Sequence, residues 1–168
     1  METKNINTKQ LSFIVRIGII FLFIIGLIMV IVWYPFTISL TIIGPVDVEP
    51  TQLQKIQVYA QSAFYYLTSV PCFIILIFLW IIAGRLKKNG RFIAKDVRLL
   101  NAANIMLLID LAIFLVGNII IVFLEINFFV LAHFFIAVIG LVVLIFMWTT
   151  TLLIRRNVEL QALIETDS

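Results

Sequence analysis

The sequence contains few charged residues and one cysteine. Charged residues make up 12% of the 168 and hydrophobic residues 63%, whereas in soluble domains about a quarter are charged. This balance excludes an ordinary soluble domain and predicts an integral membrane protein. Because Cys72 stands alone, the chain can form neither an internal disulfide nor a metal site with two cysteines, and redox chemistry has no support.

The common catalytic motifs are also absent. The chain has no G-x-S-x-G, H-E-x-x-H or P-loop pattern and no pair of carboxylates within an apolar run. Its single histidine, His133, has no Cys, Asp or Glu nearby at metal-ligand spacing. We therefore expect a protein that is not an enzyme and that holds no cofactor or metal.

Four long apolar runs account for most of the hydrophobic residues. A run of about 20 such residues forms a helix that crosses a hydrocarbon core of about 30 Å. The predicted fold is therefore all-α, a four-transmembrane-helix bundle in a single membrane domain over residues 1–168. We expect spans at about 13–34, 63–83, 102–124 and 128–154.

Local signals place several helix ends. Pro35 predicts the end of the first span, and Thr51 with Gln54 predicts a capping box at the start of the second helix. The third helix is expected to start near Ala94. Pro71 lies inside the second span and frees the carbonyl four residues before it, which predicts a kink that a neighbouring helix must satisfy.

The connections between the spans differ in composition. Residues 36–50 combine β-prone residues with glycine, prolines and acidic residues, which predicts an outer segment between the first two spans. Glu125–Asn127 alone separates the third and fourth spans, which predicts a tight outer hairpin. The last helix is expected to continue into the polar tail at 155–168.

A loop expected at 84–98 contains six of the twelve basic residues. Others lie near the amino terminus and at Arg155 and Arg156, whereas Lys55 is alone on the opposite side. Cytoplasmic loops carry the excess of positive charge, so both termini and the basic loop are predicted to be cytoplasmic. The chain would then be a multi-pass protein of the cell membrane.

Three interpretations of this basic loop stay open. Its charges can set the topology alone, contact anionic lipid headgroups, or dock a membrane or cytoplasmic protein with Phe92 as an apolar anchor. Nucleic acid is not an expected partner, because the charges cluster beside apolar segments. The candidate interaction residues are Arg85, Lys87, Lys88, Arg91, Phe92, Lys95, Asp96 and Arg98.

Asp110 is the most suggestive position within a span. It lies near mid-membrane, where an ionised Asp costs roughly 2.5–3.5 kcal/mol, so it should face the other helices. We expect it at the depth of Thr68, Ser69 and Cys72. The hypothesis is that a protonated Asp110 donates a hydrogen bond to the region broken by Pro71, either as an interhelical tie or as a proton-linked switch or ion ligand.

Asn118 and His133 lie at nearly equal depth on the two arms of the predicted outer hairpin. A structural hydrogen bond between them is favoured over a metal or titrating site. Asn104 lies roughly on the Asn118 face, which predicts a polar seam between helices.

Two stretches carry a family resemblance. The basic loop contains Gly90, Phe92, Asp96, Val97 and Arg98 in a Gly-x-Phe-x-x-x-Asp-Val-Arg pattern, and the last span is followed by Arg156–Gln161 with Glu165 and Asp167 close behind. With the four-span layout, the chain resembles the small bacterial membrane proteins catalogued as domain of unknown function 2975. Such proteins are often encoded beside a small helix-turn-helix regulator, so the resemblance implies a role in regulation or stress response.

The chain departs from that family at Arg91 and Ile93, where the family usually has Pro and a Ser or Thr. The hydroxyl would cap the third helix, and such a cap contributes about 1 kcal/mol. The tail also lacks the fuller acidic run of similar proteins.

The function favoured by the sequence is that of a non-enzymatic accessory or sensory and regulatory protein acting through protein contacts. One alternative is a proton- or ion-coupled carrier that uses Asp110. Another is an immunity protein that meets a membrane-active peptide at the acidic outer segment.

Overall fold

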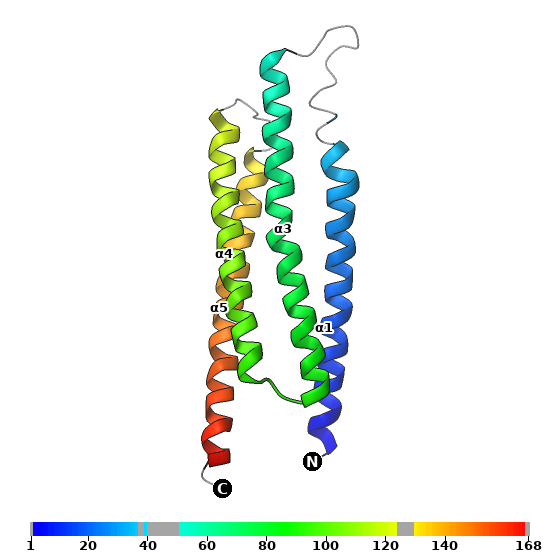
Figure 1. The fold of residues 1–168 in the computed structure, drawn as a ribbon, viewed down its shortest axis with the longest axis vertical. Coiled ribbons are helices and arrows are strands. Elements are labelled where there is room, and N and C mark those ends of the chain that lie inside the picture. The colour runs from blue at the N-terminus through cyan, green and yellow to red at the C-terminus, as the bar shows by residue number, and fades with distance from the viewer. Residues whose placement is uncertain (1, 37–38, 40–50, 124–129, 167–168) are drawn as a thin grey trace.

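The computed structural model describes residues 2–36, 39, 51–123 and 130–166, and every element in them is a helix (Figure 1). The elements are α1 (Glu2–Ile28), the π-helical turn η1 (Met29–Trp33), α3 (Gln52–Asn89), α4 (Ala94–Phe123) and α5 (Val130–Thr166). Four helices are long and apolar enough to cross a membrane, over Gln10–Phe36, Gln52–Asn89, Ala94–Ile120 and Phe134–Ile164. The prediction of an all-α chain with four membrane-length helices is confirmed.

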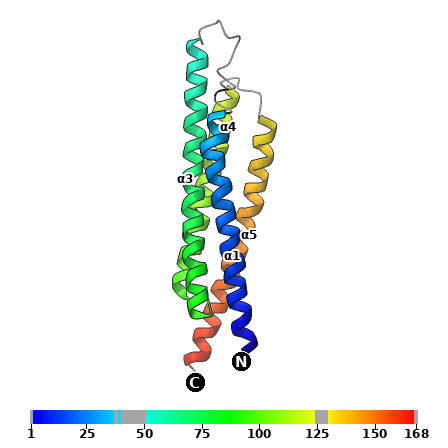
Figure 2. The ribbon, with the colours of Figure 1, turned by 90° about the vertical axis from the view of Figure 1, so that its right-hand side faces the viewer.

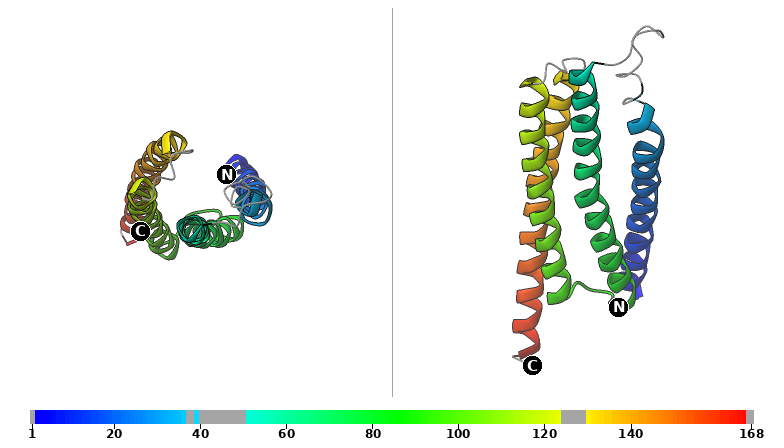
Figure 3. Two further views of the ribbon diagram at one scale, coloured as in Figure 1. Left: turned by 90° about the horizontal axis from the view of Figure 1, so that it is seen from above. Right: turned by 45° about the horizontal axis from the view of Figure 1, so that its top comes forward.

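The helices run side by side and pack in chain order, α1 against α3, α3 against α4 and α4 against α5. Seen from above, they follow an arc with α1 and α5 at its two ends (Figure 3). The side views place both termini at the end of the molecule that also holds the α3–α4 link (Figures 1 and 2). The basic residues of the link therefore lie at the same end as both termini.

The helices extend beyond the apolar runs. α1 begins at Glu2, well ahead of the span expected from about residue 13, and α5 continues into the tail as far as Thr166. The loop expected at 84–98 is wrong in extent, because the residues outside the helices are only those at 90–93. Polar and basic residues such as Lys87 continue a helix as readily as apolar ones, so the end of an apolar run is not the end of a helix.

Helix ends follow the local signals. Thr51 and Gln54 form the predicted capping box, with the Gln54 N–H donating to Thr51 Oγ1 at 3.3 Å and the Thr51 N–H to Gln54 Oε1 at 2.7 Å. The third helix starts at Ala94 as expected. Gly90 ends α3 in the left-handed region, at φ 67°, and its N–H donates to the Leu86 carbonyl at 3.0 Å. This conformation favours glycine because a Cβ would crowd the backbone.

Two prolines are accommodated within helices. α3 continues through Pro71, which is buried. The first span continues through Pro35 to Phe36, so it does not end at Pro35 as predicted. The π-helical turn ends two residues before this proline, and the Tyr34 N–H donates to the carbonyl of Met29. Wider turns of this kind accompany breaks in the regular hydrogen-bond ladder, such as the one that proline introduces.

The tightly packed part of the molecule lies towards the link. Its buried apolar side chains come from the ends of α3 and α4 that meet there: Ile82, Ala83, Leu86, Val97, Leu100 and Ala103. Elsewhere most large apolar side chains of the spans are exposed, as expected for surfaces that face lipid. The outer hairpin at Glu125–Asn127, and residues 36–50 apart from Phe36 and Ser39, lie outside the described residues.

Replacing two glycines by alanine tests the link geometry, because the two substitutions should change the free energy of unfolding in opposite directions. Gly90→Ala should lower the free energy of unfolding by about 1 kcal/mol, because alanine is strained in the left-handed region. Gly18→Ala should raise it by roughly 0.5–1 kcal/mol, since Gly18 is helical and nothing lies within 4 Å of an added Cβ. Thermal unfolding in a mild detergent measures both. Equal effects from the two substitutions would contradict the link conformation.

Candidate functional site

The α3–α4 link is organised by one buried carboxylate. Asp96 is wholly buried, and its Oδ2 accepts a hydrogen bond from the Ile93 N–H at 3.0 Å. Its Oδ1 pairs with Nη1 of Arg85 at 3.3 Å. From within α4, Asp96 thus satisfies the N–H of Ile93, the residue just before the helix, which is the role of the carboxylate in a capping box. This explains how α4 starts cleanly although Ile93 supplies no hydroxyl.

Asp96 is buried, although the sequence predicts it as an interaction residue of the basic loop. A side chain with no exposed surface contacts no partner, so Asp96 is a structural residue, and Arg85 is half-buried beside it. Phe92 is also half-buried, which leaves only part of its ring for docking. Five other predicted residues are exposed: Lys87, Lys88, Arg91, Lys95 and Arg98. We refer to these five as the basic surface.

Polar contacts join α1 to α3 near the same end. The Ser12 hydroxyl is buried and donates to the Ala83 carbonyl at 2.7 Å. The Arg16 guanidinium lies over the Trp80 ring, 5.0 Å from its centroid, and an added Cβ at Gly84 would be 3.0 Å from Arg16 Nη2. The sequence did not predict the Ser12 contact, because this serine lies in a segment that reads as a polar tail.

A second buried tie joins α4 to α5. Asn104 Nδ2 donates to Thr151 Oγ1 at 3.0 Å, and the Thr151 hydroxyl donates to the carbonyl of Met147 at 2.8 Å. Sequence reasoning placed Asn104 on a polar seam but missed Thr151, since a threonine within an apolar run resembles an ordinary packing residue. Asn118 donates to the carbonyl of Phe114 at 2.6 Å. The side chain of His133 lies outside the described part of the chain, so the Asn118–His133 pair stays a prediction.

Asp110 lies beside Cys72, at the depth expected from the sequence. The Cys72 thiol donates to Asp110 Oδ2 at 3.3 Å. The other oxygen, Oδ1, is buried and has no hydrogen-bond partner among the residues that the structure describes. Thr68 and Ser69 donate their hydroxyls to carbonyls of their own helix instead. Asp110 thus contacts the region around Pro71, but as the acceptor of the Cys72 thiol, whereas the hypothesis made a protonated Asp110 the donor.

Asp110 lines a cavity of about 470 Å³ to which all four long helices contribute. The same cavity is lined by Gly26 and by the side chains of Tyr34, Thr68, Ser69 and Cys72. We call it the Asp110 cavity. Its walls are otherwise almost entirely aliphatic and aromatic, so one carboxyl group lies within an apolar surround.

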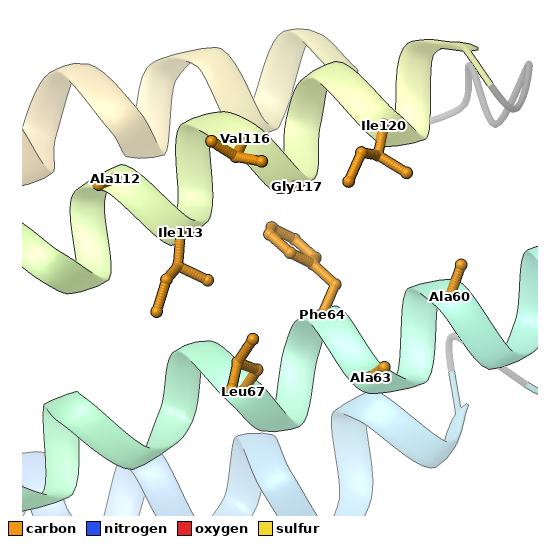
Figure 4. A pocket seen from close by; sticks show the side chains of 9 residues that line it. All are labelled: Ala60, Ala63, Phe64, Leu67, Ala112, Ile113, Val116, Gly117 and Ile120. Carbon is orange, nitrogen blue, oxygen red and sulfur yellow. The ribbon is translucent and has the colours of Figure 1, made fainter.

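A separate cavity of about 530 Å³ lies between α3 and α4 (Figure 4). The side chains that line it are all apolar, and the Phe64 ring points from α3 to the bare backbone of Gly117 on α4. A cavity without a polar or titratable side chain offers no chemistry, so we assign it to lipid-facing packing.

Neither a metal site nor a similarity to known proteins assigns a further role to these residues. The described residues contain no group of three His, Cys, Asp or Glu side chains placed to hold a metal ion. Comparison with known proteins finds no match to this chain among family models, curated proteins or solved structures.

The structural role of Asp96 predicts an effect on stability. Asp96→Ala leaves the Ile93 N–H and the Arg85 guanidinium without their partner, so the free energy of unfolding should fall by about 1–3 kcal/mol. Glu159→Ala is the matched control, because Glu159 pairs with Arg155 on an exposed helix surface and such pairs contribute about 0.3–0.5 kcal/mol. Thermal unfolding in detergent compares the two variants. Equal losses would show that Asp96 is not a structural anchor.

Proposed function

We propose that this chain is an accessory or regulatory protein of the cell membrane that works by binding another protein and catalyses no reaction. In the proposed topology the four helices form an open-sided bundle, with both termini and the α3–α4 link in the cytoplasm and residues 36–50 outside. The excess of basic residues at the link end supports this orientation. The resemblance to domain of unknown function 2975 supports a regulatory role.

The observation that carries this proposal is the exposed end of α5. In Figure 1 this helix projects past the α3–α4 link. Its last turns expose Leu160, Leu163 and Ile164, at 51%, 63% and 71% of their full surface. Spacings of three and four residues bring such side chains to one side of a helix. An apolar helix face of this kind is what partner proteins bind in a hydrophobic groove.

The length of α5 supports the placement of Leu160, Leu163 and Ile164 outside the membrane. The candidate membrane span within α5, Phe134–Ile164, has 31 residues and includes the charged residues Arg155, Arg156 and Glu159. At about 1.5 Å per residue it measures roughly 45 Å, whereas the hydrocarbon core is about 30 Å thick. The final turns are then free to leave the lipid, where exposed leucines favour a protein contact.

The basic surface is the second element of the proposed contact. Its five cations are exposed on the link and on the adjoining ends of α3 and α4, and the backbone there is held by Asp96 and by the Gly90 cap. A rigid group of like charges selects an acidic partner surface and speeds its association. The expected partner therefore combines an apolar groove with acidic residues at its rim.

A carrier is the second candidate function, because Asp110 lines a cavity rather than lying between close-packed helices. The third expectation, immunity against a membrane-active peptide, rests on the outer segment, most of which lies outside the described residues.

Labelling tests the proposed topology. In a Cys72→Ala background, a cysteine at Asn89 should react with a membrane-impermeant thiol reagent only after the cells are opened. A cysteine at Gln52, at the other end of α3, should react in intact cells. Reaction of the Asn89 cysteine in intact cells would show that the chain has the opposite orientation.

Site-specific photocrosslinking tests the proposed contact. A photoreactive residue at Leu163 should give one discrete protein adduct in native membranes, and Leu160→Glu should abolish that adduct by placing a charge in the apolar face. The same photoreactive residue at Phe146, which is exposed within the apolar run of α5, is the control and should label lipid. Lipid adducts alone at Leu163 would mean that the helix end lies on the bilayer and that the proposed function is wrong.

A further inference from the structure

The Asp110 cavity has the dimensions of a ligand site. Its volume of about 470 Å³ falls within the roughly 300–1,000 Å³ typical of pockets for small molecules. Its walls come from every helix of the arc, including Gly26 of α1 and Val143 of α5 at the two ends. Those two helices stand at the two ends of the arc in Figure 3.

The carboxyl group of Asp110 is only partly satisfied. Oδ2 receives the Cys72 thiol, a weak donor, and the buried Oδ1 receives nothing from the described residues. A carboxylate offers about four acceptor positions and is costly to bury without a donor or a positive charge. A ligand group that is both a hydrogen-bond donor and positively charged would offset this cost.

The other lining groups fit the apolar part of such a molecule. The Thr68 and Ser69 hydroxyls are directed to carbonyls of their own helix. Phe73 and Phe114 present aromatic rings, whose faces attract cations, and Leu107 and Met147 present flexible aliphatic surface. The cavity thus combines one anionic group with a surround suited to hydrocarbon.

We propose that the Asp110 cavity binds a lipophilic cation, an amphiphilic amine whose ammonium group pairs with the Asp110 carboxylate while its alkyl or aryl part fills the apolar walls. A lipid acyl chain fits the walls equally well but offers no positive charge to the carboxylate, so the cation is the better match. The inference names a ligand for the second candidate function and requires membrane insertion of the chain. It does not depend on the contact proposed for α5.

Calorimetric titration of the purified full chain in detergent tests this site with two probes of equal chain length, decylammonium and decanol. The wild-type protein should bind decylammonium more tightly than decanol. Asp110→Asn should weaken decylammonium binding by roughly tenfold or more, as loss of a charge-assisted hydrogen bond predicts, and leave decanol unchanged. Glu159→Gln, which alters an exposed carboxylate far along α5, is the control and should change neither titration.

Two results would overturn the proposal. Equal affinity of the wild-type protein for both probes would mean that the cavity takes only hydrocarbon. Unchanged decylammonium binding in Asp110→Asn would mean that the carboxylate is not the counter-ion. If Asp110→Asn fails to fold, Val143→Phe takes its place, since a larger side chain should fill the cavity and reduce decylammonium binding, and unreduced binding would contradict the site. Leu160→Glu should leave both titrations unchanged, so a failure of the cavity proposal can be told apart from a failure of the contact proposed for α5.

Discussion

The burial of Asp96 is the interaction on which the arrangement of these helices depends. Its carboxylate accepts from the N–H of Ile93, just before α4, and pairs with Arg85 near the end of α3, so it fixes how the chain turns from one helix to the next. α1 is tied to this hairpin through Ser12 and α5 through the buried Asn104–Thr151 pair. Because lipid offers hydrocarbon side chains the same surroundings as a protein interior, close packing and polar ties of this kind decide where membrane helices associate.

The position of these ties explains why the cavities lie where they do. The buried apolar residues gather around the link, and towards the other end the helices keep most of their large apolar side chains exposed. The two cavities lie in that less closely packed part, one between α3 and α4 and one within the arc. Asp110 lies at the wall of the cavity within the arc, where the Cys72 thiol contacts its Oδ2.

The sequence predicted the features that depend on local composition. Apolar runs identified the four membrane-length helices, Thr51 and Gln54 identified the start of α3, and depth along the spans brought Asp110 beside Cys72. It did not predict that Asp96 is buried, because a charged residue in a basic stretch looks solvated until its partners across the link are known. The Thr151 and Ser12 contacts were missed for the same reason, since each joins residues far apart in the chain.

The central claim is that the helices are held together near the link while α1 and α5 stand apart across the Asp110 cavity. Cysteine crosslinking in native membranes with a short bifunctional reagent, in a Cys72→Ala background, tests it most directly. Cysteines at Phe23 and Phe73, whose ring centroids lie 5.3 Å apart, should crosslink readily. Cysteines at Leu22 and Val143, on opposite walls of the cavity, should not. Equally efficient crosslinking of the second pair would mean that the helices close into a sealed bundle and that the account is wrong.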